Sequence, residues 1–110
     1  NAYTVTDSIL EEIVVVPNPY NATSVYEHIA FIREVQFMGL PEECLIRIFN
    51  TAGELVQVIK HDVSSPGYRG PSIEAWDLRT YNNQEVSFGV YVFHVIANDK
   101  EFTGKLAVIK

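Results

Sequence analysis

The sequence is poor in several features that would point to a particular function. Cys44 is the one cysteine among 110 residues, so no disulfide can form within the chain. A lone cysteine in a strand is usually a small buried apolar residue. No stretch of about 18 apolar residues occurs, so no transmembrane helix is predicted. The first residue is Asn1 rather than Met, which is typical of a processed product or an excised fragment.

Basic residues are also scarce. Eight Lys and Arg stand against 14 Asp and Glu, which gives a formal net charge of −6 at pH 7. A phosphate backbone repels such a chain, and so does an anionic lipid surface. We therefore expect neither nucleic acid nor a membrane surface among the partners.

Motifs that carry catalysis or cofactor binding are missing. There is no glycine-rich phosphate loop, no paired-cysteine motif, no HExxH and no GxSxG. His61 and Asp62 precede Ser64 and Ser65, which are residue types of a hydrolase triad, but no nucleophile elbow or oxyanion hole accompanies them. The histidines lie on separate predicted elements, so we predict no enzyme, no cofactor and no metal site. They are His28, His61 and His94.

Short apolar runs of about four to eight residues recur along the chain instead. Each is bounded by Gly, Pro, Asn or Asp, which is typical of an all-β sandwich or barrel. We expect strands near residues 12–16, 29–38, 44–50, 55–61, 72–78, 88–97 and 101–109.

Turn residues separate these runs. Asn50 to Gly53 fits a tight hairpin with Gly53 in the left-handed conformation, and Asn98-Asp99 fits a two-residue hairpin loop. The stretch 64–72 holds two prolines and two glycines, so we expect a longer loop that crosses between sheets.

Pro17 and Pro19 directly follow the β-branched run Val14 to Val16. Because proline lacks an N–H group, it is tolerated at a sheet edge. We expect these prolines to end the first strand at an edge and to carry the chain to the next element. The sequence therefore divides into an N-terminal arm, residues 1–12, and a domain, residues 13–110.

Four blocks of the sequence resemble a known family. They are VVVPNPY, GLPEECLIRIFNTAGELVQVIKH, WDLRTYNNQEVSFGVYVFHV and TGKLAVIK. In this order they resemble the FlgD-like immunoglobulin-type domain, which is found at the C-termini of secreted bacterial surface proteins. That domain is similar to the type IX secretion C-terminal domain. The resemblance covers residues 13–110. It implies an Ig-like antiparallel β-sandwich of about seven strands, an extracellular or cell-surface setting, and no catalysis.

The marked residues of this resemblance have physical interpretations. We expect Trp76 to fill the core between the sheets and Asp77 to accept backbone hydrogen bonds in the following turn. Gly89 allows a close backbone approach or a kink, and Tyr91 is expected to bury its ring and bind a loop through its hydroxyl. The family often has glycine at the position of Leu78, so the turn at this residue is the one place where we expect the conformation to differ from that of the family.

Three predicted strands carry apolar residues on both faces. They are 44–50, 55–61 and 88–97. Since only one face of each strand can meet the core of a sandwich, the other face leaves an apolar patch. Such patches usually mark a surface for a partner.

The N-terminal arm is a candidate for that partner contact. Tyr3 and Val5 alternate with threonines as in a strand, and Ile9 and Leu10 add a second apolar anchor. Twelve extended residues span roughly 40 Å, which is enough to reach a neighbouring molecule and to add a strand to its sheet edge. Such a head-to-tail contact builds a filament. The alternative is that the arm is the tail of a linker from a preceding domain.

The sequence thus predicts a structural, extracellular module that acts through protein–protein contacts. In the first version it is a self-assembling surface fibre subunit that exchanges its arm with a second copy. The alternative is a C-terminal sorting or anchoring module that contacts a neighbouring domain of the same secreted protein. A second alternative is a carbohydrate-binding module, for which Tyr68, Tyr81 and Phe88 are the exposed aromatic candidates.

Overall fold

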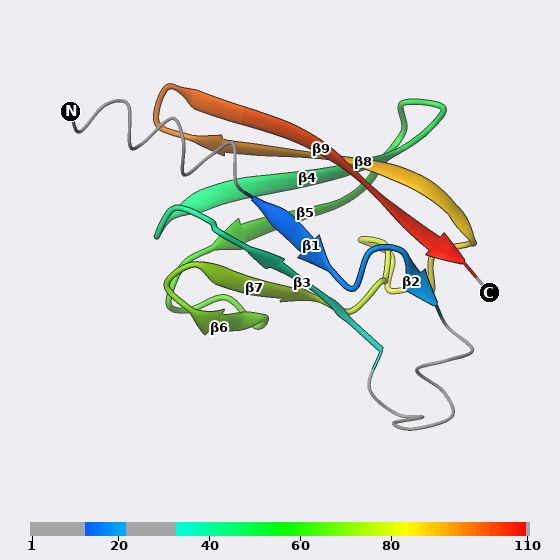
Figure 1. The fold of residues 1–110 in the computed structure, drawn as a ribbon, viewed down its shortest axis with the longest axis horizontal. Helices are drawn as coiled ribbons and strands as arrows, with labels where there is room; N and C mark the ends of the chain where they lie inside the picture. Colours follow the sequence, from blue (N-terminus) through cyan, green and yellow to red (C-terminus); the bar gives the residue numbers. More distant parts are fainter. Residues whose placement is uncertain (1–12, 22–32, 110) are drawn as a thin grey trace.

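The computed structural model describes residues 13–21 and 33–109, and all regular elements in these ranges are strands (Figure 1). No helix in this part of the chain is long and apolar enough to cross a membrane. The strands are β1 (Val14–Val16), β2 (Tyr20–Asn21), β3 (Val35–Met38), β4 (Cys44–Asn50), β5 (Leu55–His61), β6 (Tyr68–Gly70), β7 (Ile73–Trp76), β8 (Gly89–Ala97) and β9 (Lys100–Ile109).

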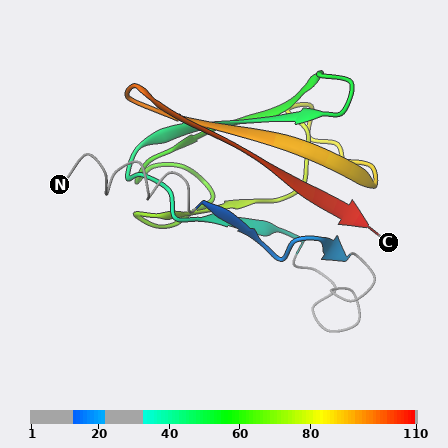
Figure 2. The same cartoon turned by 45° about the horizontal axis from the view of Figure 1, so that its top comes forward.

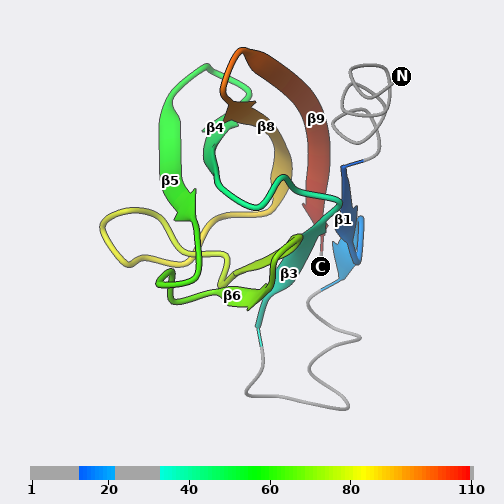
Figure 3. The same cartoon turned by 90° about the vertical axis from the view of Figure 1, so that its left-hand side faces the viewer.

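The strands form two sheets that face each other (Figures 2 and 3). One has the order β1-β3-β7-β6 and the other the order β2-β9-β8-β4-β5. All neighbouring strands are antiparallel except β2 and β9, which are parallel over two residue pairs. The prediction of an all-β, Ig-like sandwich is confirmed.

The described ranges hold nine strands rather than the expected seven, because two short strands lie where the sequence predicts none. β2 follows Pro19 directly, and β6 lies inside the loop expected over 64–72, where it forms a hairpin with β7. The strand expected over 72–78 ends at Trp76, and the one expected over 29–38 begins at Val35 within the described residues.

Pro17 and Pro19 connect the two sheets. β1 lies at the edge of the four-stranded sheet, and β2 lies at the edge of the five-stranded sheet. Both X-Pro peptide bonds are cis. Between the prolines, the Asn18 side chain donates from Nδ2 to the Lys105 carbonyl at 3.1 Å and accepts at Oδ1 from the Ala107 N–H at 3.1 Å. A side-chain amide thus extends the edge contact that β2 makes with β9.

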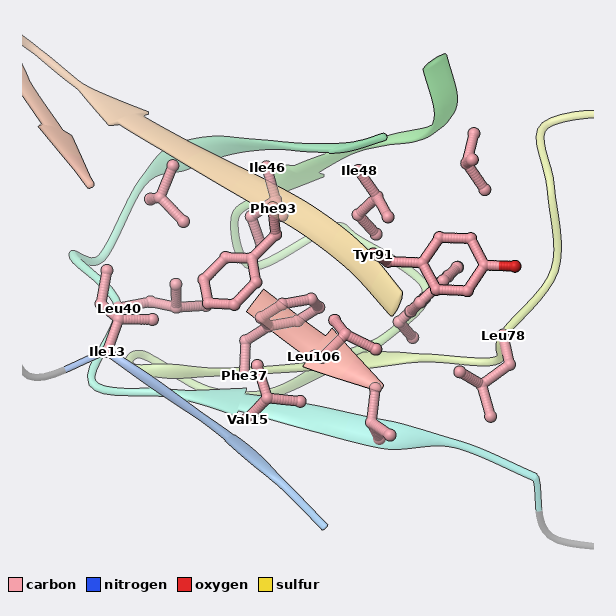
Figure 4. Packing of buried hydrophobic residues seen from close by; sticks show 14 of the residues in the cluster. Ile13, Val15, Phe37, Leu40, Ile46, Ile48, Leu78, Tyr91, Phe93 and Leu106 are labelled. Carbon is pink, nitrogen blue, oxygen red and sulfur yellow. The ribbon is translucent and has the colours of Figure 1, made fainter. Parts of the chain in front are cut away.

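Aromatic rings fill the space between the sheets (Figure 4). Phe37 of β3 meets Phe93 of β8 edge to face at 5.1 Å between ring centroids, and Trp76 meets Tyr91 in the same way at 6.4 Å. The inward residues of β4, Ile46 and Ile48, are fully buried beside them. Each such side chain contributes about 1.5–3 kcal/mol by leaving water.

The two hairpins follow the turn chemistry of the sequence. Gly53 adopts φ +85°, and Asn50 closes the β4–β5 turn with its side chain, which accepts from the N–H groups of Ala52 and Glu54. A register shift between Ile48 and Phe49 accompanies this turn. Asn98, in the β8–β9 loop, has φ +56°.

Leu78 is an exception to ordinary turn chemistry. It has φ +62°, a conformation that suits glycine, and yet its side chain is fully buried. Its backbone carbonyl accepts a hydrogen bond from the Val86 N–H at 3.0 Å. The left-handed backbone costs about 1–2 kcal/mol, which the burial of leucine offsets.

This balance predicts an unusual order of stability for two variants. Leu78→Ala loses the buried side chain and keeps the left-handed strain, so it should lower the unfolding free energy by about 2–5 kcal/mol. Leu78→Gly loses the same side chain but removes the strain, and should be about 1 kcal/mol more stable than the alanine variant. Urea denaturation of the three proteins measures this, and an alanine variant as stable as the glycine variant would contradict it.

Candidate functional site

The outward face of the five-stranded sheet is a surface of mixed apolar and charged side chains, called here the outer face. Along β8 the outward residues alternate with the buried Tyr91 and Phe93 of the inner face. The outer face comprises Leu45, Arg47, Phe49, Leu55, Val58, Lys60, Val90, Val92, His94, Ile96, Glu101, Thr103, Lys105, Ala107 and Ile109.

Cross-strand pairing arranges this face in rows. Leu55, Phe49 and Val92 lie side by side across β5, β4 and β8 and form one apolar row. The adjacent row is more polar: Arg47 pairs with Val58 on one side and with His94 on the other.

Several of these apolar side chains are open to solvent. Leu55 and Val58 are each 42% exposed and Val90 is 45% exposed, whereas Leu45, Phe49, Val92 and Ile96 are half-buried. The apolar patch is present, but its side chains are less exposed than the sequence pattern predicts, because side chains on a sheet face shield their cross-strand neighbours.

The four arm residues proposed as partner contacts lie outside the described residues. They are Tyr3, Val5, Ile9 and Leu10. The structure does describe a strand edge that could receive an extended segment. β9 has ten residues, and within the described ranges only its last two pair with a strand on the side away from β8.

A groove runs between this edge of β9 and β1, called here the β1–β9 groove. Its lining residues are Ile13, Val14, Val15, Asn18, Phe93, Phe102, Gly104 and Lys105. The rings of Phe93 and Phe102 lie 5.9 Å apart between centroids, and Phe102 is only half-buried. The groove therefore exposes part of the ring layer of the core.

Gly104, and not Gly89, is the glycine that space requires in this sheet. A Cβ on Gly104 would lie 2.5 Å from the Phe93 ring. A Cβ on Gly89 would meet nothing within 4 Å, so the close approach considered for Gly89 is wrong; its φ of +153° is the reason for glycine there. The signal for Gly104 was not readable from its own strand, because the ring comes from β8.

The other structural residues lie where the core meets the loops. Trp76 is buried and donates its indole N–H to the Arg79 carbonyl at 3.0 Å. Asp77 accepts from the Arg79 N–H at 3.2 Å. The Tyr91 hydroxyl donates to the Ser87 carbonyl at 2.6 Å, from a ring that is 5% exposed.

A buried polar cluster joins the two sheets on the side of the sandwich opposite to the β1–β9 groove. His61 of β5 contacts Glu74 of β7 at 2.6 Å between Nδ1 and Oε1, and both side chains are fully buried. The other ring nitrogen lies 2.8 Å from the Pro71 carbonyl. Since a carbonyl only accepts, His61 Nε2 carries a hydrogen, and one further proton is shared between Nδ1 and the carboxyl. The pair therefore has no net charge.

This cluster does not have the geometry of a hydrolase triad. Ser65 Oγ lies 2.7 Å from Glu74 Oε1, so serine and histidine both bind the carboxylate and neither ring nitrogen is available to activate the hydroxyl. Asp62 is used locally: the hydroxyl and N–H of Ser64 donate to it and hold the pKa of its carboxyl below the usual value.

The remaining histidines do not converge with His61 within the described residues. His94 lies on the outer face, 3.1 Å from Glu101, and His28 is outside the described ranges. No cluster of three or more potential metal ligands occurs in the described part of the chain. Of the aromatic candidates for carbohydrate binding, Tyr68 stacks on His61 at 5.5 Å, whereas Tyr81 and Phe88 are exposed.

Cys44 lies at the start of β4, next to this cluster. It is 8% exposed, and burial together with the nearby Glu74 raises the pKa of its thiol from 9.0 to about 12. Because the thiolate is the reactive form of cysteine, the raised pKa lowers the reactivity of Cys44 in the folded protein.

Comparison with solved structures identifies the same fold in two larger proteins. PorZ, reported as an essential bacterial surface component of the type-IX secretion system of Porphyromonas gingivalis, matches with a TM-score of 0.70 and 24% identity over 94% of this chain and 12% of the PorZ chain. Dimeric latent PorU of the same bacterium matches with a TM-score of 0.53 and 19% identity, over 88% of this chain and 9% of PorU.

At these identities the likeness establishes the fold alone. The chain spans about an eighth of PorZ and less than a tenth of PorU. No protein-family model matches the sequence, and no curated protein matches it either.

The state of Cys44 predicts a pH dependence of stability. Above pH 9 the unfolded thiol ionises while the folded thiol stays protonated up to about pH 12, so the unfolded state gains and stability falls as pH rises. Between pH 7 and pH 10 this loss is about 1.4 kcal/mol, and Cys44→Ala should lack it. Urea denaturation at both pH values gives the difference between the two proteins, and a difference that does not change with pH would contradict the prediction.

Proposed function

We propose that this chain is a non-enzymatic, surface- or secretion-associated module that acts through protein–protein contacts. The observation that carries the proposal is the outer face, where Leu55, Val58 and Val90 are exposed among half-buried apolar neighbours. A sheet face of this kind gains free energy by packing against another protein surface, at about 25 cal/mol per Å² of apolar area removed from water.

The likeness to PorZ supports an extracellular or cell-surface location. In PorZ the matching part is a small fraction of a long chain, and that protein is a surface component of a secretion system. A module of the FlgD-like immunoglobulin type, serving in sorting or anchoring of a larger secreted protein, fits both this likeness and the sequence blocks quoted above. The partner of the outer face is then a neighbouring domain or a component of the secretion system.

A role without catalysis is supported by the state of the polar residues. The buried His61–Glu74 pair is fully engaged with Ser65 and the Pro71 carbonyl, and Cys44 is held protonated. A carbohydrate-binding role is less favoured, because Tyr68 is committed to His61 and leaves two exposed aromatic residues on separate loops.

A surface fibre subunit is the second candidate, favoured by a separate observation. Among the described residues, no strand pairs with Glu101 to Gly104 on the side away from β8. An unpaired edge is a ready template for a strand from another molecule.

A display experiment tests the proposed function. A reporter with a signal peptide is joined to residues 1–110 as its C-terminal domain and expressed in Porphyromonas gingivalis. We expect antibody to label the reporter on intact cells. A reporter that stays inside the cell would contradict the secretion-associated role.

A matched pair of variants in the same reporter tests the outer face. Val58→Glu places a carboxylate opposite Arg47, so the fold tolerates it, but a buried charge disfavours packing against a partner. We expect at least a tenfold loss of surface label, about 1.4 kcal/mol. Val63→Glu makes the same change at a residue that is 75% exposed and off the sheet, and should retain the label. Equal label for the two variants would exclude the outer face as the contact.

A further inference from the structure

Among the described residues, no strand pairs with Glu101 to Gly104 on the side away from β8, and this part of the β9 edge presents a defined set of backbone groups. Asn18 binds the Lys105 carbonyl and the Ala107 N–H from the side away from β8, so the odd-numbered residues of β9 direct their backbone outward. By the same alternation, the backbone N–H and C=O of Glu101 and Thr103 also point outward. An incoming strand can therefore pair with these backbone donors and acceptors, which lie on the N-terminal side of the residues that Asn18 binds.

The two faces of this edge differ in polarity. Inward, Phe102 and Gly104 border the β1–β9 groove, whose floor is formed by aromatic rings. Outward, Glu101, Thr103 and Lys105 are polar and exposed. A strand that pairs here must therefore present apolar side chains on one face and polar side chains on the other.

Residues 3–6 of the arm have this alternation. Tyr3 and Val5 would lie over Phe102 and Gly104, while Thr4 and Thr6 would lie beside Thr103 on the polar face. Tyrosine over the half-buried Phe102 ring would complete the burial that the domain leaves unfinished.

The length of chain before Ile13 favours a second copy as the source of this segment. β1 and β9 run the same way (Figure 1), and Ile13 lies in the same groove as Phe102. Val5 is eight residues before Ile13, and those residues span roughly 26 Å when fully extended. To lie over Gly104 of its own chain, Val5 would need this segment to turn back, whereas the extended span reaches the edge of a second copy.

We propose that the open edge of β9, centred on Glu101 and Thr103, is the acceptor for residues 3–6 of the arm of a second copy. The segment pairs as a strand with the edge of β9 on the side away from β8, and each copy gives its arm to the next. This inference rests on the second candidate for the proposed function, the surface fibre subunit, and names the site at which subunits join.

A proline at the acceptor edge tests the backbone pairing. Thr103→Pro removes an outward N–H and leaves the ladder with β8 intact, so the sandwich should fold while the edge is blocked. Thr103→Val is the matched control, because it changes the side chain and keeps the N–H. We expect sedimentation equilibrium to show self-association of the wild type and the valine variant, and at least a tenfold weaker association of the proline variant.

A cysteine pair identifies the occupant independently of any effect on folding. In a Cys44→Ala background, Thr4→Cys with Thr103→Cys should give a ladder of disulfide-linked oligomers under mild oxidation, because facing positions on paired strands are close enough to bridge. Thr4→Cys with Val63→Cys, an equally accessible position off the edge, should give no ladder.

The outcomes separate this inference from the proposed function. A ladder, together with weaker association of Thr103→Pro, supports the acceptor site. A linked monomer in place of the ladder would overturn the second copy as occupant, and no link at all with unchanged association of Thr103→Pro would overturn the site. The reporter experiment on the outer face does not depend on either result.

Discussion

The hydrogen bond between His61 and Glu74 fixes how the two sheets meet. Apolar packing between sheets is strong but has no direction, so it does not by itself set one sheet against the other. This pair joins β5 to β7 at 2.6 Å in the interior and gives the packing a fixed point. Because the pair carries no net charge, it avoids the large cost of an isolated ion in the core. Tyr68 stacks on the imidazole and seals the cluster from the β6 side.

The opposite side of the sandwich is tied in a different way, and the difference creates the candidate interaction surface. There the chain itself crosses between sheets through Pro17 and Pro19, and Asn18 and β2 cover only the last part of β9. The first part of β9 and the rings beneath it stay accessible from the β1–β9 groove. One side of the sandwich is thus closed by buried polar bonds, and the other is closed only at one end.

Strand periodicity, which repeats every two residues, made most of this fold readable from the sequence. It predicted β4, β5, β8 and β9 to within one residue, and it indicated that β4, β5 and β8 carry apolar residues on both faces. It missed β2 and β6, since two- and three-residue strands next to proline and glycine have no period to read. It also did not predict the left-handed backbone of Leu78 or the contact of Gly104 with Phe93. A left-handed leucine breaks the usual residue preference, and the ring comes from another strand. The His61–Glu74 pair joins residues of different sheets, and the spacing of these residues in the sequence does not predict the contact.

The buried thiol of Cys44 has a consequence for where such a module can work. A thiol that is 8% exposed and whose pKa is raised to about 12 stays protonated near neutral pH, so it reacts slowly with glutathione, oxidants or a partner's disulfide. The folded domain therefore keeps the same covalent structure in reducing and in oxidising surroundings.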